Sequence, residues 1–229
     1  MSQNLSCSSR NCILSRLAAA DFRLLKPDLE AVDLPLRKVL ERRQRRVDNI
    51  YFPESGLASV VANGSGKKAI EVGIIGREGM TGLAVVLGNN RPHHETYIQI
   101  AGNGQRLKAS ALRKALDHSS SLHCSLLQYA HSFHNQTART ALANGRSTIE
   151  ERLARWLLMA NDRVGGDELP LTHGCLAVTL GVTRPGVTVA LQELERVRSI
   201  ARRRGSIIIL DREALKQRSN GAYHPADFQ

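Results

Sequence analysis

The chain has 229 residues and a formal net charge of +11, because 32 Lys and Arg residues outnumber 21 Asp and Glu residues. Hydrophobic residues make up 42% of the sequence and charged residues 23%, which is usual for a soluble globular protein with a sizeable core. The positive charge points to a polyanionic partner, nucleic acid first and an anionic membrane second, although a basic enzyme could carry the same charge.

The sequence also indicates a compartment. No run of about 18 apolar residues predicts a transmembrane helix. The N-terminal segment is interrupted by Arg10, Asn11 and Arg16, so it does not have the continuous apolar region of a secretory signal. We therefore expect a cytoplasmic protein without a membrane partner, and free thiols at its scattered cysteines. These cysteines are Cys7, Cys12, Cys124 and Cys175.

The first half of the chain changes from a helical to a strand pattern. Residues 13–46 are expected to be helical but polar, and the basic run 37–46 is interpreted as a solvated helix face, with a second nucleic-acid surface as the alternative. From residue 47 to about 108, short β-branched runs alternate with Gly-containing turns, which predicts a small antiparallel barrel or jelly roll. Residues 95–110 are expected to hold its last strands.

Helices return after the strands. Residues 110–118 predict a short helix. A much longer helical pattern follows, in which mostly apolar residues are separated alternately by four and three positions, as in the contact seam of a coiled coil. This spacing indicates a dimerisation helix, although a helix packed on the barrel has similar spacing. The expected dimerisation residues are Leu122, Leu126, Tyr129, Phe133, Gln136 and Thr140.

A helix-turn-helix is predicted in the last third. Residues 147–166 predict a helix that begins with a capping box, Thr148 with Glu151, and ends at Gly165-Gly166. Residues 173–180 then predict the first helix of the motif, with Gly181 in the turn. Capping threonines precede both helices of the motif, and the second helix has a clear apolar face. These residues are Thr172 and Thr183 for the caps, and Val187, Ala190, Leu191 and Leu194 for the face.

The start of this second helix is unusual, because it contains Arg184, Pro185 and Gly186. Proline is tolerated in a first helical turn, glycine allows close approach of another backbone, and a helix N-terminus favours phosphate. Arg184 could donate two hydrogen bonds to guanine. Residues 195–215 then predict two short strands joined by the turn 202–205, which form a basic wing. Between residues 184 and 218, nine Lys or Arg residues outnumber four acidic residues.

Together these features resemble the Crp/Fnr family of bacterial transcription regulators. The resemblance covers nearly the whole chain and is most specific over residues 149–197, where the second helix of the motif reads Arg-Pro-x-Val-Thr-x-Ala-Leu. It implies an α+β fold with an N-terminal cyclic-nucleotide-binding-like antiparallel β-roll (jelly roll), a long dimerisation helix and a C-terminal winged helix-turn-helix. The implied domains are residues 1–118, 119–145 and 146–229.

The resemblance also assigns residues to DNA. Thr172, His173 and Thr183 are expected near backbone phosphate, and Arg184 matches the arginine that reads a base. Pro185 stands where the best-known member has a base-contacting glutamate, so a different target sequence is expected. The full set of expected DNA-binding residues is Thr172, His173, Thr183, Arg184, Pro185, Gly186, Thr188, Gln192, Arg203 and Arg204.

The sensor half departs from the nucleotide-binding members. Those members hold a cyclic phosphate with a Gly-Glu-Leu segment and an Arg-Ser/Thr-Ala segment, whereas residues 79–83 here read Gly-Met-Thr-Gly-Leu and residues 94–96 read His-Glu-Thr. Cyclic AMP is therefore not expected to bind. The cysteines lack iron–sulfur spacing, and two adjacent histidines in a polar loop are typical of exposed residues rather than metal or haem ligands. We expect no cofactor or metal, and the effector stays unknown.

The sequence thus predicts a homodimeric regulator that binds a roughly palindromic double-stranded DNA site. RNA polymerase is a further possible partner, because the loop 161–170 is placed where some relatives contact it. Two alternatives are an enzyme with a basic cleft for an anionic ligand and a protein-interaction module. No nucleophile elbow, phosphate loop, dinucleotide fingerprint or metal-ligand pair supports catalysis, and an interaction module does not need clustered arginines.

Overall fold

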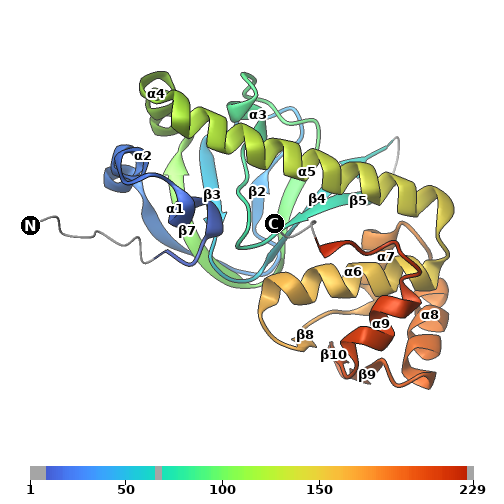
Figure 1. Ribbon diagram of the computed structural model, residues 1–229. Helices are drawn as coiled ribbons and strands as arrows, with labels where there is room; N and C mark the ends of the chain where they lie inside the picture. The colour runs from blue at the N-terminus through green and yellow to red at the C-terminus, as the bar shows by residue number, and fades with distance from the viewer. Residues whose placement is uncertain (1–8, 65–68, 226–229) are drawn as a thin grey trace, which may run out of the picture. The chain divides into compact units, whose positions relative to one another are not determined.

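The computed structural model describes residues 9–64 and 69–225, which form two compact units (Figure 1). The first unit consists of Met1–Ala58 and Ile75–Ser132, and the second of Ser59–Ile74 and Phe133–Gln229. A segment of the N-terminal half therefore belongs with the C-terminal half. Cys12, Cys124 and Cys175 form no disulfide, as expected, and Cys7 lies outside the described residues.

The helices and strands follow the predicted change from β to α along the chain. The first unit holds α1 (Cys12–Arg16), α2 (Ala19–Leu25), a 3-10 turn (Lys26–Asp28), β1 (Glu30–Leu34), β2 (Val39–Glu41), β3 (Asn49–Pro53), α3 (Leu83–Val86), β6 (Glu95–Ile100), β7 (Gly102–Lys108) and α4 (Ala109–His118). Strands β4 (Leu57–Asn63) and β5 (Ala69–Ile75) lie mainly in the second unit, and α5 (Ser120–Arg146) contributes to both. The second unit continues with α6 (Ile149–Val164), β8 (Glu168–Leu169), α7 (His173–Leu180), α8 (Arg184–Arg196), β9 (Ile200–Arg203), β10 (Ser206–Ile209) and α9 (Arg212–Arg218).

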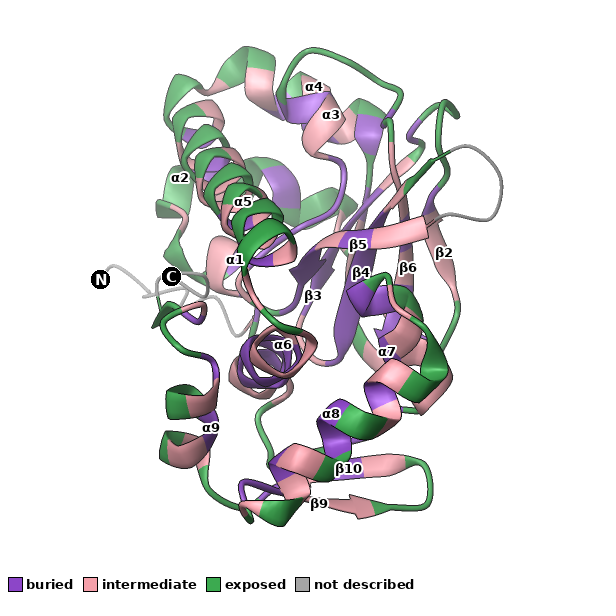
Figure 2. Ribbon diagram, turned by 90° about the vertical axis from the view of Figure 1, so that its right-hand side faces the viewer, coloured by how far each residue is buried: buried purple, intermediate pink, exposed green. Residues whose placement is uncertain are grey.

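The strands of the first unit pair in antiparallel fashion, which confirms the predicted β-roll. Strand β7 lies between β1 and β3, and β2 pairs with β6. Ile50 and Phe52 of β3 and Leu107 of β7 are fully buried. Strand β3 is coloured as buried over most of its length (Figure 2). They belong to one apolar core with Leu14 of α1 and Leu112 of α4. The roll is thus a packed core whose cover is made by the flanking helices.

The expected helix over residues 13–46 is wrong for most of its length. The chain is helical only as far as Asp28, and β1 and β2 follow. Strand β1 lies at the edge of its sheet and buries only Leu34. Its sequence therefore lacks the alternation of apolar and polar residues by which a half-buried strand is recognised. The basic run 37–46 ends in a turn in which Gln44 has a φ of 57°. Residues 42–46 of that run are exposed, so the run is solvated as expected but is not a helix face.

The long helix α5 confirms the helix predicted after residue 118, but its predicted seam packs within the chain. Leu122 and Leu126 are fully buried in the core of the first unit. The Tyr129 hydroxyl donates to the Met80 carbonyl at 3.2 Å. Further along, the Gln136 side chain accepts from the Ile74 N–H at 2.7 Å and donates to the Ile74 carbonyl at 3.2 Å. The side chains of these four residues therefore make their contacts within their own chain.

The dimerisation role expected for Leu122, Leu126, Tyr129, Phe133, Gln136 and Thr140 stays a prediction, and the contacts of Leu122, Leu126, Tyr129 and Gln136 within their own chain do not favour it. A helix packed on its own sheet and a coiled-coil seam have the same spacing, so periodicity alone could not separate them. The opposite side of α5, here called the outer face, also repeats at intervals of three and four residues, and all its members are exposed. They are Cys124, Leu127, His131, His134, Ala138, Ala141 and Gly145.

The β4–β5 hairpin supports the C-terminal part of the second unit. A Cβ atom on Gly181 would come within 2.8 Å of Ile70 Cδ1, so β5 lies directly against the turn between α7 and α8. Arg152 of α6 donates to the Leu180 carbonyl at the end of α7. The hairpin and α6 together hold this turn in place.

Glu71 of β5 is buried in the same unit. The Ser59 hydroxyl donates to one of its carboxyl oxygens and the Trp156 indole N–H to the other. Burial raises the pKa of Glu71 to about 8, because loss of water disfavours the charged carboxylate more than the two hydrogen bonds and the nearby Arg155 and Arg163 favour it. Ionisation of Glu71 therefore opposes the packing of the hairpin.

We expect the second unit to lose stability as the pH rises from about 4.5 towards 8. An unfolded chain releases the Glu71 proton near the ordinary pKa of 4.5, whereas the folded chain holds it to about pH 8, so the folded state binds more protons in this interval. Urea unfolding can be followed by fluorescence of Trp156, the single tryptophan. Glu71→Gln, which cannot ionise, should flatten the profile. Parallel profiles for the two proteins between pH 5 and 8 would show that another group is responsible.

Candidate nucleic-acid interface

Helices α7 and α8 form the predicted helix-turn-helix. Their axes differ by 104°, within the range usual for this motif. Thr172 caps α7 by accepting from the Cys175 N–H at 3.2 Å, and Thr183 caps α8 by accepting from the Gly186 N–H at 3.4 Å. Gly181 has a φ of 61°, the left-handed conformation that the turn requires. The predicted helix 173–180, both caps and the turn glycine are confirmed.

Helix α8 has one buried and one exposed side (Figure 2). The predicted inner face is confirmed, because Val187, Ala190, Leu191 and Leu194 are all buried. On the other side Arg184, Pro185 and Gln192 are exposed, and Val189 is 60% exposed. Pro185 lies in the first helical turn, where its missing N–H loses no hydrogen bond. The exposed side of α8 is therefore available to a partner.

Gly186 is placed differently from the other expected contacts. A Cβ atom there would lie 3.4 Å from Ile149 Cδ1, an ordinary contact that points towards the start of α6. Gly186 is intermediate in exposure. Gly186 therefore faces the start of α6 within the second unit, and its N–H donates a hydrogen bond to the Thr183 side-chain oxygen.

The Arg184 guanidinium lies over the first turn of α7. A Cβ atom on Gly174 would be only 3.1 Å from Arg184 Nη2, so the absence of a side chain at Gly174 makes room for the arginine. The Thr188 hydroxyl donates to the Arg184 carbonyl at 3.0 Å and lies 3.1 Å from His173 Nδ1. Because the hydroxyl proton is already engaged, His173 Nδ1 is the donor of that second bond. Three expected DNA-binding residues thus meet where α7 and α8 begin.

The predicted wing is confirmed as β9 and β10, and β8 adds a third strand that the sequence did not reveal. Arg202 of β9 pairs with Glu195, which lowers the pKa of that carboxyl, chiefly through the hydrogen bond from the guanidinium. Arg203 and Arg204 are exposed at the turn of the wing. The first arginine of the basic turn therefore fixes the wing, and the other two face solvent.

The wing and the start of α7 line a common hollow of about 290 Å³. Thr172 and His173 form one side, and Arg203 and Arg204 form the other. The structure therefore brings four of the expected DNA-binding residues together from two segments of the chain. An exposed hollow with two guanidinium groups beside a helix N-terminus is suited to a phosphate group.

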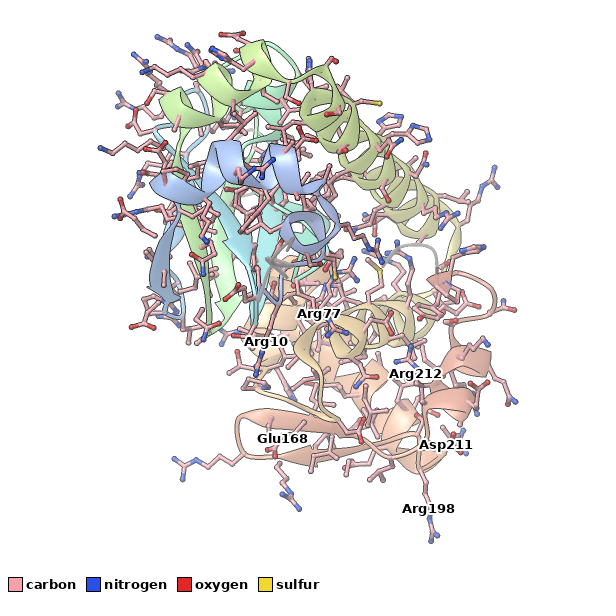
Figure 3. All side chains as sticks on the ribbon, turned by 60° about the vertical axis from the view of Figure 1, so that its left-hand side comes forward. Arg10, Arg77, Glu168, Arg198, Asp211 and Arg212 are labelled. Carbon is pink, nitrogen blue, oxygen red and sulfur yellow. The ribbon has the colours of Figure 1, made fainter. Side chains whose placement is uncertain are left out.

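The cations of this region divide into two groups. Five of the nine Lys and Arg residues between positions 184 and 218 make ion pairs, to Glu193, Glu195, Glu213, Asp162 and Glu150. Among the described residues, none lies within ion-pair distance of Arg184, Arg198, Arg203 or Arg204, and all four are exposed. Sequence reasoning named three of the four. It left out Arg198, whose side chain extends away from the protein (Figure 3).

The loop 161–170 is used largely by the fold. Arg212 of α9 pairs with Asp162 and donates to Asn161, and Glu168 accepts from the Ser206 hydroxyl of the wing at 2.7 Å. Arg212 and Glu168 are labelled in Figure 3. Residues 165–167 and Pro170 are the parts of this loop that are exposed and lie outside any helix or strand.

In the first unit, the segments 79–83 and 94–96 meet around Glu41. This buried carboxylate accepts from the Gly82 N–H at 3.0 Å and from the Thr96 hydroxyl at 2.7 Å, and His94 Nε2 lies 3.7 Å away. A Cβ atom on Gly79 would collide with the Tyr129 hydroxyl. The chain's own carboxylate therefore satisfies donors that these two segments present.

Over residues 9–64 and 69–225, no single helix is long and apolar enough to cross a membrane. Helices α7 and α8 taken together as one bent pair are long and apolar enough to cross a membrane by length and composition alone. In this structure the apolar side of that pair is buried in the second unit.

Comparisons with known proteins agree with this geometry. Residues 151–218 match the model of the Crp-like helix-turn-helix domain. A transcriptional regulator of the Crp/Fnr family from Eubacterium rectale has a similar structure, with a TM-score of 0.72 and 15% identity over 93% of this chain and 99% of that one. FixK2 from Bradyrhizobium japonicum gives 0.71 and 18% over 82% and 96%. The c-di-GMP responsive regulator CLP of Xanthomonas campestris gives 0.67 and 15% over 84% and 99%. At these identities the likeness concerns the fold. Among curated proteins no sequence matches.

Proposed function

We propose that the chain is a transcription regulator of the Crp/Fnr type, which binds a roughly palindromic double-stranded DNA site as a homodimer; its fold and its Crp-like helix-turn-helix domain support this role. Helix α8 enters the major groove with its N-terminal end, and Arg184 reads a guanine with its two outer nitrogens. Thr172, His173, Thr183, Arg203 and Arg204 hold the flanking phosphates. Pro185, Thr188 and Gln192 complete the surface that faces the bases.

The observation that carries this proposal is the position of the unpaired arginines. Arg184 lies at the start of α8, and Arg203 and Arg204 line the hollow beside the start of α7. A cation that serves only the fold is expected to have an acidic partner, as Arg202 and Arg212 do. These three arginines leave their charge to solvent on the side where both helices begin, which suits a polyanion. The alternatives of an enzyme or a protein-interaction module are not favoured.

Dimerisation is proposed through the outer face of α5. Its members are exposed in the single chain and repeat at the spacing of a coiled-coil seam. Of the six members between Leu127 and Gly145, four are small or apolar, namely Leu127, Ala138, Ala141 and Gly145. Small residues allow two helices to approach closely around a two-fold axis. A pair of such chains presents two copies of α8, which matches a DNA site with two half-sites.

RNA polymerase is proposed as a further partner through residues 165–167, which are exposed in the loop 161–170. The adjoining residues Asp162 and Glu168 hold α9 and the wing. A contact at the turn would therefore leave the DNA-binding fold intact.

The salt dependence of DNA binding tests the role of the wing. Each phosphate contact contributes a slope of about −0.9 to a plot of log K against log salt concentration, so Arg203→Gln with Arg204→Gln is expected to reduce the slope by about 1 to 2. Fluorescence anisotropy with a labelled duplex between 50 and 300 mM salt measures this slope. Arg198→Gln is the matched control, because Arg198 is also unpaired but lies beyond the opposite end of α8. An equal slope in the wing variant and the wild type would contradict the assigned phosphate contacts.

A further inference from the structure

The first unit contains a second hollow, which the proposed DNA interface does not use. Helix α3 with the turn that follows it, helix α4 and the beginning of α5 line an open hollow of about 700 Å³. This volume lies within the range of small-molecule sites in proteins. All the residues that line it belong to the first unit.

One part of the hollow is apolar. Val86 of α3 is buried, Leu116 of α4 is partly exposed, and Leu87 in the turn after α3 is 64% exposed. A large aliphatic side chain with this exposure, beside a concave surface, offers area that an apolar ligand can cover. The apolar wall therefore favours a hydrocarbon portion in the ligand.

The polar part of the hollow contains an unsatisfied donor. The Nη2 atom of Arg113 is buried, and no described residue accepts a hydrogen bond from it. Asp117, one turn further along α4, also lines the hollow but forms no ion pair with Arg113 in the described part of the chain. A buried guanidinium nitrogen without an acceptor is costly, so an oxygen atom of a ligand at this position would be strongly favoured.

His123 of α5 contributes to the same polar side. Its Nε2 lies 3.1 Å from the Val86 carbonyl, which can only accept, so Nε2 carries a proton. The ring is thereby fixed between α5 and α3 at the edge of the hollow. Arg113 and His123 thus add nitrogen-bearing side chains to a lining that also contains aliphatic residues.

We propose that this hollow binds a small monocarboxylate with an apolar tail. The carboxylate accepts from Arg113, whose planar guanidinium matches its geometry, and the tail lies against Val86, Leu87 and Leu116. A single arginine with Asp117 nearby suits one negative charge better than the two charges of a phosphate monoester, since the second charge would face the aspartate.

Octanoate is a suitable probe, with 1-octanol and octyl phosphate as matched compounds of equal chain length. In isothermal titration calorimetry of the full chain without DNA, octanoate is expected to bind saturably, once per chain, and about tenfold or more tightly than octanol. Arg113→Gln should reduce this preference to less than about twofold. Lys114→Gln, which removes an exposed charge from the same helix, should leave it unchanged.

The proposal would be overturned by no saturable binding of octanoate, by equal affinity for octanoate and octanol in the wild-type chain, or by the same loss in Lys114→Gln as in Arg113→Gln. Tighter binding of octyl phosphate than of octanoate would also reject the carboxylate. Arg113→Lys serves if Arg113→Gln does not fold, and it should keep a reduced preference, because it retains the charge without the planar fork. Since DNA is absent, these outcomes are independent of the DNA-binding function.

Discussion

Replacing Arg184 by Ala should weaken binding to the specific DNA site by about 5- to 150-fold per half-site, the equivalent of about 1–3 kcal/mol for a bidentate base contact. The side chain is exposed and unpaired, and it lies over Gly174 at the start of the interface. Its removal should therefore cost little folding stability. The loss should also depend on the DNA sequence: in the variant, the identity of one base pair in each half-site should no longer affect the affinity.

Equilibrium titrations with duplexes changed one base pair at a time measure both effects. Lys216→Ala is the control, because it removes a positive charge from α9 of the same unit without touching the interface. Arg184→Lys should keep part of the affinity and lose the base preference, since an ammonium group cannot bond in two parallel directions. If Arg184→Ala retained both the affinity and the base preference of the wild type, the assigned recognition role would be wrong.

Replacing Ala138 by Glu should convert the dimer into a monomer and reduce affinity for the specific site by about 100-fold or more. Ala138 is exposed and lies in the middle of the outer face of α5. Around a two-fold axis the two introduced carboxylates would lie close together, where like charges repel and lose their water. A monomer engages one half-site at a time and loses the gain from two linked contacts, which is commonly 100-fold or larger.

Sedimentation equilibrium gives the mass of the variant, and anisotropy with the specific duplex gives its affinity. Ala138→Ser, which keeps a small neutral side chain, should stay dimeric. The substituted position is exposed in the single chain, so far-UV circular dichroism should be unchanged. A dimeric Ala138→Glu variant with wild-type affinity would place the dimer contact elsewhere than on the outer face.

The helix-turn-helix could be predicted almost residue by residue, because local chemistry determines it. Thr172 and Thr183 are caps with short side-chain oxygens, and Gly181 is the residue that adopts a positive φ without strain. The capping box of Thr148 with Glu151 and the end of α6 at Gly165 follow from the same rules. Such signals act within three or four residues and do not depend on the rest of the fold.

Features that depend on distant partners could not be predicted in this way. The edge strand β1 has too few buried residues to show alternation, and β8 has only two residues. The stripe from Leu122 to Thr140 was predicted as a dimerisation seam, but its spacing does not say what packs on it, and Leu122, Leu126 and Gln136 are buried in their own chain. The pairing of Arg202 with Glu195 could not be distinguished from the unpaired state of Arg203 and Arg204, because three consecutive arginines look alike in sequence.

Selection of duplexes from a random-sequence DNA pool, with the purified chain at a fixed salt concentration of about 150 mM, tests the central claim most directly. We expect a two-fold symmetric site whose half-sites are about one helical turn apart, with a guanine in each half-site whose recovery depends on Arg184. Enrichment of no sequence above a salt-sensitive background, or of a single site without symmetry, would contradict a homodimeric regulator that reads DNA through α8.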